Sequence, residues 1–96
     1  MVFIDLDAYE MINKEHTHEY IARMLRIADE NNNLDVLFNT LKGIDYEVII
    51  RLKNSQVIER NLGNYGIRLI ETMNLASQQN PKLHMRLIWQ NGVYNG

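Results

Sequence analysis

The chain has 96 residues, of which 46% are hydrophobic and 23% charged, with a net charge of -2 and no cysteine. These values are typical of one globular domain and exclude a disulfide framework, a thiolate metal site and a cysteine nucleophile. No apolar run approaches the length of a membrane span, and no signal peptide is recognisable after Met1. We therefore expect a single soluble, cytoplasmic domain over residues 1–96.

The first third of the chain predicts a strand followed by a helix. Residues 1–6 form an apolar run with β-branched and aromatic members, which is typical of a buried strand. A helix is predicted from Thr17 to Asp29, because Thr17 is a suitable N-cap. Apolar residues at helical spacing form its inward stripe: Ile21, Met24, Leu25 and Ala28. Residues 29–33 then connect this helix to the next.

The most informative segment runs from Asn31 to Gly43. Asn33 is a good N-cap for a short helix, and Gly43 stands where a left-handed terminating residue is expected. One apolar stripe has the helical spacing i, i+3, i+4 and i+7: Leu34, Leu37, Phe38 and Leu41. Asp35 and Asn39 project from the other side, one turn apart. The segment thus predicts a helix with one face to bury and a small polar face to present.

A second strand and two further helices are predicted beyond this segment. The strand covers residues 47–52, and its continuous run Val48-Ile49-Ile50 suggests that both of its faces are covered. A short helical piece follows over residues 56–61. A longer helix runs from Asn64 or Tyr65 to about Gln79, where Asn80-Pro81 stops it.

The last strand is predicted over residues 83–89, as an edge strand with one solvated face. Its buried face should hold Leu83, Met85, Leu87 and Trp89, and its solvated face His84, Arg86 and Ile88. Residues 90–96 are predicted to be a polar, frayed tail. Because helices separate the successive strands, the chain predicts an α/β fold, a three-stranded parallel sheet packed with about four helices.

Charge is unevenly distributed along the chain. Residues 1–48 hold ten acidic and four basic side chains, whereas residues 49–96 hold two acidic and six basic ones. The 31–43 segment lies in the acidic half, so we expect it to bind a basic partner and not nucleic acid. The alternative is that the charges of the two halves intermix in space.

Two other polar clusters are weaker candidates for a functional site. His16 and His18 flank Thr17, but residues two apart do not share a helix face and no third ligand stands out, so we predict no metal site. Asp5 and Asp7 end the first strand, where some hydrolases place carboxylates, although a solvated strand end explains them more simply. The chain lacks nucleophile–base and phosphate-loop motifs, so we expect neither catalysis nor a cofactor.

The run Asn33-Leu34-Asp35-x-Leu37-Phe38-x-x-Leu41-x-Gly43 resembles the loop and second helix of the barstar-like family of intracellular ribonuclease inhibitors. The rest of the chain agrees in order and spacing. A Val-Ile-Ile strand follows the glycine, and Asn64-Tyr65-Gly66 opens the last helix. The resemblance covers nearly the whole chain, and it too implies a three-stranded parallel sheet packed with helices.

The resemblance implies a one-to-one complex with a basic nuclease, either a barnase-like ribonuclease or a related toxin. In this family the loop and second helix block the nuclease active site, and acidic side chains take the place of substrate phosphates. The implied partner-binding residues are Asp29, Glu30, Asn31, Asn33, Leu34, Asp35, Phe38, Asn39, Lys42, Gly43 and Ile44.

Three positions depart from the family pattern. Asn39 stands where the family has its principal acid, Leu75 stands near the place of another interface acid, and Asp29 replaces an aromatic residue in the loop. An amide can form hydrogen bonds but no ion pair. These departures favour a different nuclease as the partner. The alternative is a non-inhibitory interaction module of the same fold whose partner has diverged.

Overall fold

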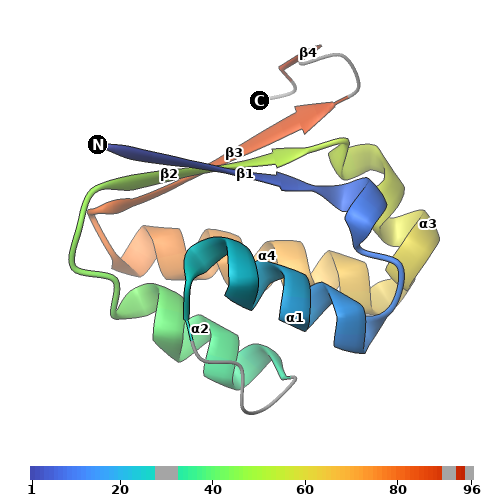
Figure 1. The fold of residues 1–96 in the computed structure, drawn as a ribbon, viewed down its shortest axis with the longest axis horizontal. Helices are drawn as coiled ribbons and strands as arrows, with labels where there is room; N and C mark the ends of the chain where they lie inside the picture. Colours follow the sequence, from blue (N-terminus) through green and yellow to red (C-terminus); the bar gives the residue numbers. More distant parts are fainter. Residues whose placement is uncertain (28–32, 90–92, 95–96) are drawn as a thin grey trace.

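A computed structural model describes residues 1–27, 33–89 and 93–94 of the chain. The strands are β1 (Val2–Asp7), β2 (Val48–Lys53), β3 (Leu83–Trp89) and β4 (Val93–Tyr94). The helices are α1 (Lys14–Leu25), α2 (Leu34–Lys42), α3 (Ile58–Leu62) and α4 (Asn64–Gln79), with short 3-10 helices at Ala8–Glu10 and Ser55–Val57. The strands β1, β2 and β3 are parallel neighbours in that order (Figure 1). Across the described residues, the predicted α/β fold with a three-stranded parallel sheet and four helices is confirmed.

The helices that the structure describes all pack on the same face of the sheet. Figure 1 shows α1, α2 and α4 together on one side of the strands, so the prediction that both faces of β2 are covered is wrong. The outer face of β2 is shielded by its neighbours instead, because Ile49 lies in register between Phe3 of β1 and His84 of β3. Ile49 is consequently half-buried without a second layer of helices.

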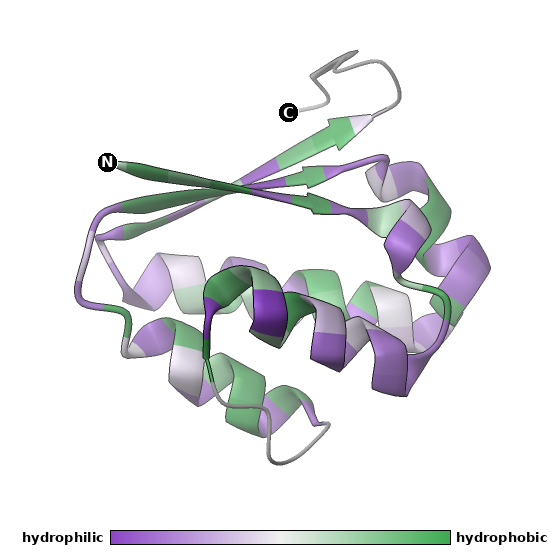
Figure 2. Cartoon of the chain, viewed as in Figure 1, coloured by the Kyte–Doolittle hydropathy of each residue, from purple (hydrophilic) through white to green (hydrophobic). Residues whose placement is uncertain are grey.

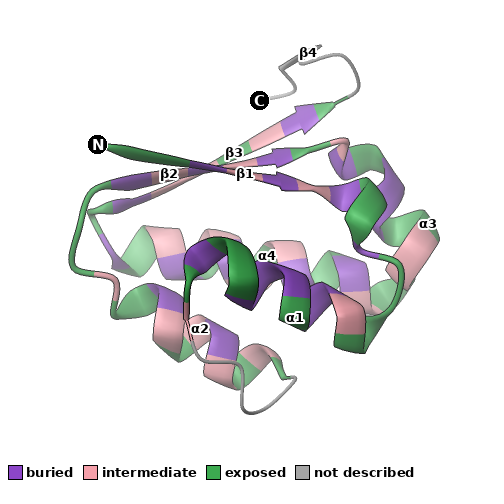
Figure 3. Ribbon diagram, in the orientation of Figure 1, coloured by how far each residue is buried: buried purple, intermediate pink, exposed green. Residues whose placement is uncertain are grey.

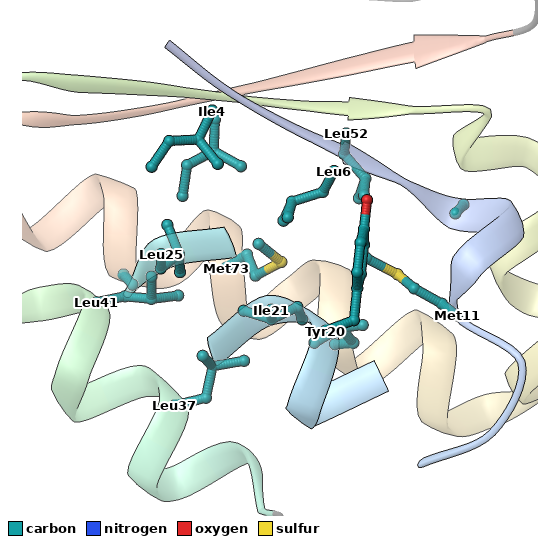
Figure 4. Close-up of a cluster of buried hydrophobic side chains, with 14 of the residues drawn as sticks. Ile4, Leu6, Met11, Tyr20, Ile21, Leu25, Leu37, Leu41, Leu52 and Met73 are labelled. Atoms are coloured by element: carbon teal, nitrogen blue, oxygen red, sulfur yellow. The ribbon is translucent and has the colours of Figure 1, made fainter. Parts of the chain in front are cut away.

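The core lies between the sheet and the helical layer. Alternate strand residues point towards the helices, as the pleat of a strand requires, and burial follows this alternation (Figure 3). Figure 4 shows the resulting cluster, with Ile4, Leu6 and Leu52 from the strands, Ile21 and Leu25 from α1, Leu37 and Leu41 from α2, and Met73 from α4. The apolar stripe of α2 is therefore held by the same core that holds the sheet.

Helix α1 begins earlier than the predicted start at Thr17. Its N-cap is Asn13, whose side-chain oxygen accepts a hydrogen bond from the His16 N–H at 2.8 Å. Thr17 lies inside the first turn, and its hydroxyl donates to the Asn13 carbonyl at 2.6 Å. Asn and Thr are both good N-caps, and here the earlier of the two starts the helix.

Helix α1 also ends earlier than predicted, at Leu25. Arg26 adopts a left-handed conformation with φ of 56°, and the Ile27 N–H returns to the Ala22 carbonyl at 3.0 Å. This arrangement closes a helix as a terminal glycine usually does. The predicted end at Asp29 lies outside the described residues.

The end of β3 departs from the predicted pattern. Ile88 is buried although it was assigned to the solvated face, and its carbonyl accepts a hydrogen bond from the Ser55 hydroxyl at 3.4 Å. Trp89 is exposed, because the end of β3 rises away from the helices (Figure 1). Val93–Tyr94, placed in the predicted tail, forms β4 and pairs antiparallel with β3. The strand β3 is therefore not the outermost strand, and β1 forms an open edge of the sheet.

Candidate functional site

Helix α2 begins as the sequence predicts. Asn33 has an extended backbone, and its side-chain oxygen accepts a hydrogen bond from the Val36 N–H at 2.8 Å. The Asn33 carbonyl accepts the Leu37 N–H at 3.2 Å. These two bonds fix the first turn of the helix, where Asp35 lies near the positive end of the helix dipole. The backbone that carries Asp35 is thus fixed by local hydrogen bonds.

The apolar stripe of α2 anchors the helix. Leu37 and Leu41 are buried in the core, and Leu34 and Phe38 are half-buried against it. The Lys42 ammonium lies 5.1 Å from the centre of the Phe38 ring, within the range of a cation–π contact. Phe38 therefore contributes to the core while part of its ring stays accessible to a partner.

The C-terminal end of α2 is closed differently from the prediction. Gly43 has φ of -88° and ψ of 0°, which is a right-handed conformation, so the expected left-handed glycine is wrong. The buried side chain of Asn80 takes over this function. Its amide nitrogen donates to the Leu41 carbonyl at 3.1 Å and to the Ile44 carbonyl at 2.9 Å. Asn80 follows α4, so this contact also ties α2 to the junction of α4 and β3.

The polar face of α2 is open to solvent. Asp35 and Asn39 are exposed one turn apart, as predicted, and Lys42 and Gly43 extend this exposed surface to the helix end. Ile44 is half-buried just beyond the helix. The predicted loop residues, Asp29, Glu30 and Asn31, lie outside the described part of the chain.

A groove runs beside this face, between α2 and α4. Leu34 and Asp35 of α2 form one wall, and Arg68, Glu71 and Thr72 of α4 form the other. The two helices pack closely on each other in the helical layer (Figure 1). The structure therefore adds a second helix to the site that was predicted on α2 alone.

The sequence contains a signal for this second wall. Arg68, Glu71, Thr72 and Leu75 have the spacing i, i+3, i+4 and i+7, which places them on one stripe of α4. Leu75 ends the stripe and is 46% exposed, an unusual position for a large apolar side chain. The stripe alone does not reveal which helix lies beside it, so Arg68, Glu71 and Thr72 were missed, and Leu75 was noted only through the family resemblance.

Both acids of the groove lack a basic partner within the described residues. No ion pair between two described residues involves Asp35 or Glu71. The Arg68 guanidinium lies instead 5.8 Å from the centre of the Tyr65 ring. Burial raises the pKa of the Tyr65 hydroxyl, although Arg68 acts in the opposite direction. The groove thus presents two carboxylates and one guanidinium to solvent or to a partner.

The carboxylates at the end of β1 have structural partners. Asp5 accepts from Arg51 Nε at 2.6 Å and lies 3.1 Å from Lys53 Nζ. Desolvation acts to raise the pKa of Asp5, but the hydrogen bonds from Lys53 and Arg51 outweigh it and hold the pKa below its ordinary value. Asp7 accepts from the Tyr9 N–H and from Asn54 Nδ2, both at 3.0 Å. Both carboxylates therefore have hydrogen-bond or ion-pair partners within the fold.

The histidines also have structural contacts. The His18 ring is buried and hydrogen-bonded to the Tyr65 hydroxyl, and His84 lies 3.1 Å from a Glu47 carboxylate oxygen. The described residues bring together no group of three or more His, Cys, Asp or Glu side chains fit to hold a metal ion. None of the helices described is both long and apolar enough to cross a membrane.

Comparison with protein-family models and with curated proteins gave no match for this chain. The candidate site therefore rests on its own geometry, which is a capped and anchored helix with an exposed polar face beside a groove. Two acids that form no ion pair with another described residue line that groove, one on each side. Such a surface is suited to accepting hydrogen bonds from a cationic protein.

Proposed function

We propose that this chain is a cytoplasmic protein inhibitor that binds a basic nuclease one-to-one and blocks its active site with α2. The observation that carries the proposal is Asp35, an exposed acid on a helix that is capped by Asn33 and clamped by Asn80. The resemblance of residues 31–43 to the barstar-like inhibitors supports the nuclease as the class of partner. The chain itself acts by occupying the site, without catalysing a reaction.

The chemistry of recognition follows from the groove. Nuclease active sites hold cationic side chains that bind the phosphates of the substrate, and carboxylates can accept charge-assisted hydrogen bonds from the same groups. Asp35 and Glu71 offer two such acceptors on neighbouring helices. Asn39 adds an amide that can both donate and accept. In this proposal Asp29 and Glu30, which lie outside the described residues, add to the negative charge that attracts a basic partner.

A preformed helix favours tight binding. Because Leu37 and Leu41 hold α2 in the core, little conformational freedom is lost when a partner binds. Opposite charge on the two proteins also accelerates their encounter, and this acceleration weakens as salt screens the charges. We therefore expect fast, salt-sensitive association with a basic nuclease.

The test is to titrate the protein into RNA-cleavage assays with a panel of secreted guanyl-specific ribonucleases. We expect at least one nuclease to lose its activity at a one-to-one ratio, and the complex to elute as a single species in gel filtration. Unchanged cleavage by every nuclease at excess protein would contradict the proposal.

A second function is favoured by two residues of the same surface. Leu75 is 46% exposed on α4 and Asn39 is uncharged, so the surface is more apolar and less acidic than the pattern of the barstar-like inhibitors implies. These features suit a non-inhibitory interaction module with a diverged partner. The effect on RNA cleavage distinguishes the two functions. An inhibitor stops cleavage at a one-to-one ratio. A non-inhibitory module either does not bind the nuclease or forms a stoichiometric complex in which the nuclease still cleaves RNA.

A further inference from the structure

The strand β1 presents main-chain hydrogen-bonding groups at the open edge of the sheet. The Val2 N–H donates to the Glu47 carbonyl at 3.0 Å, towards β2, whereas the Asp7 N–H donates to the Tyr20 hydroxyl at 2.8 Å, on the other side. Main-chain groups alternate in direction along a strand. Phe3 and Asp5 therefore share the outward direction of Asp7, but among the described residues no side chain from α1 hydrogen-bonds to their main-chain groups as Tyr20 does to that of Asp7.

The first half of this edge is apolar and exposed. Figure 2 colours the start of β1 as hydrophobic, and Figure 3 colours it as exposed. Phe3 is 55% exposed, and a groove beside it is lined further by Val2, by Met24 of α1 and by Tyr46. Edge strands are usually protected by charges, prolines or a covering segment. The residues at positions 2–4 carry none of these charges or prolines.

We propose that a second copy of this chain docks on this edge, with the two β1 strands antiparallel. Placing the two-fold axis at Ile4 sets Phe3 of each copy opposite Asp5 of the other. Both residues direct their N–H and C=O groups outward, so each opposing pair can exchange two main-chain hydrogen bonds. The two sheets then form one continuous sheet. This proposal is independent of the nuclease-binding site, with which the groove shares no lining residue.

The charges at the edge are complementary in this register. Arg51 pairs with Asp5 at 2.6 Å, and its guanidinium lies 4.9 Å from the centre of the Phe3 ring. Antiparallel pairing therefore brings Asp5 of one copy next to the Phe3–Arg51 contact of the other. Lys53, 3.1 Å from Asp5, supplies a further positive charge in each copy. The two Asp5 carboxylates thus approach one another only with their cations beside them, which limits their repulsion.

A second copy supplies the chemistry that the edge requires. The occupant lies along the edge as an extended segment beside the exposed Phe3 ring. The strand β1 of a second copy is such a segment, and in this register its own exposed Phe3 lies diagonally across from Phe3 of the first copy on the outer face of the sheet. Only a short stretch of edge is free, so the interface is small and we expect a weak dimer, with a Kd of about 10–100 μM.

Sedimentation velocity over a wide range of protein concentration tests the proposal. We expect the wild-type mass to rise from the 11.3 kDa of one chain towards twice that value. Phe3→Pro removes an outward N–H while leaving the Val2–Glu47 bond in place, and proline is tolerated at sheet edges. We expect this variant to weaken the dimer at least about tenfold. A wild type that stays monomeric throughout overturns the proposal and leaves a foreign peptide as the alternative occupant.

A second variant covers the case in which Phe3→Pro does not fold. Met24→Glu places a charge in the groove from α1, outside the strand, and we expect it to weaken the dimer by a similar factor. Ile67→Glu on α4 is its matched control, because Ile67 and Met24 are both 39% exposed. A dimer that resists Met24→Glu, or that is weakened equally by Ile67→Glu, uses another surface and overturns the proposal.

Discussion

Two carboxylates on opposite sides of the molecule have different surroundings. Asp5, on the outer face of the sheet, is held by Arg51 and Lys53. Asp35, on α2, has no ion pair with any described residue, and it borders a groove whose other wall holds a second acid. The carboxylate of Asp5 is used within the fold. The carboxylate of Asp35 remains available to a cation on another protein.

The backbone that carries Asp5 and the backbone that carries Asp35 are both held by hydrogen bonds. Asp5 lies in a paired strand, and Asp35 lies in a helix with a side-chain cap at its start and an asparagine clamp at its end. The difference between the two surfaces is therefore one of charge pairing and not of rigidity. An acid on a fixed backbone, with no ion-pair partner in the part of the chain that the structure describes, is the feature that makes α2 the candidate binding surface.

The largest expected effect comes from Asp35→Ala on nuclease binding. Removing one member of a buried charge pair in the complex should cost about 2–5 kcal/mol of binding free energy. Folding should lose less than about 1 kcal/mol, the contribution of an acid to a helix dipole. Isothermal titration calorimetry and urea unfolding measure the two losses. Glu59→Ala is the matched control, since Glu59 is also an exposed acid in the first turn of a helix. Equal losses in binding and folding would make Asp35 a structural residue.

Asn80→Ala should have the next largest effect, on stability. It leaves the carbonyls of Leu41 and Ile44 without the amide that now donates to both, which should cost about 1–3 kcal/mol of unfolding free energy. Chemical denaturation measures this loss. Gln78→Ala, at an exposed position of α4, should change stability by less than about 0.5 kcal/mol. If both variants unfold at the same denaturant concentration, Asn80 does not clamp α2.

The paired carboxylate predicts a pH dependence of smaller size. The pKa of Asp5 is lowered in the folded protein, so its stabilisation is present above the unfolded value and is lost as the pH falls through the folded value, below 3.8. Since the pair is partly exposed, the loss should not exceed about 1 kcal/mol. Wild type and Asp5→Asn, compared by urea unfolding at neutral pH and at a pH below the folded pKa of Asp5, should differ in stability only at neutral pH. A constant difference would mean that the ion pair contributes nothing.

The smallest expected effect is a gain of stability in Arg26→Gly. Arg26 is exposed and holds a left-handed conformation, which costs a residue with a side chain about 1–2 kcal/mol. Glycine removes this strain but loses about 0.5–1 kcal/mol through the greater entropy of its unfolded chain. We therefore expect a net gain of about 0.5–1 kcal/mol in thermal or urea unfolding. A loss of stability would indicate that the Arg26 side chain makes a stabilising contact.

The parts of the fold that depend on local signals were predictable from the sequence. The N-cap at Asn33 and the stripe of Leu37 and Leu41 follow from residues within a few positions of one another. The end of α4 at Gln79 follows in the same way from Asn80-Pro81. The start of α1 was misplaced because Asn13 and Thr17 are both suitable caps, and local preference does not choose between them.

Features that depend on distant residues were not predictable. Gly43 need not be left-handed, because Asn80, far along the chain, satisfies the end of α2. The run of apolar residues in β2 is typical of a strand with both faces covered. In the structure, Ile49 is instead shielded by Phe3 and His84, its register partners on the two neighbouring strands. The second wall of the groove required the packing of α4 on α2. In each case a partner distant in sequence decides the outcome.

The most direct test of the central claim is NMR mapping of amide signals as a basic guanyl-specific ribonuclease is added. We predict that the largest shifts fall on residues 33–44 and on the Arg68–Leu75 stripe, while the signals of Asp5, Arg51 and Arg86 stay in place. Shifts confined to the outer face of the sheet, with those of α2 unchanged, would contradict the account.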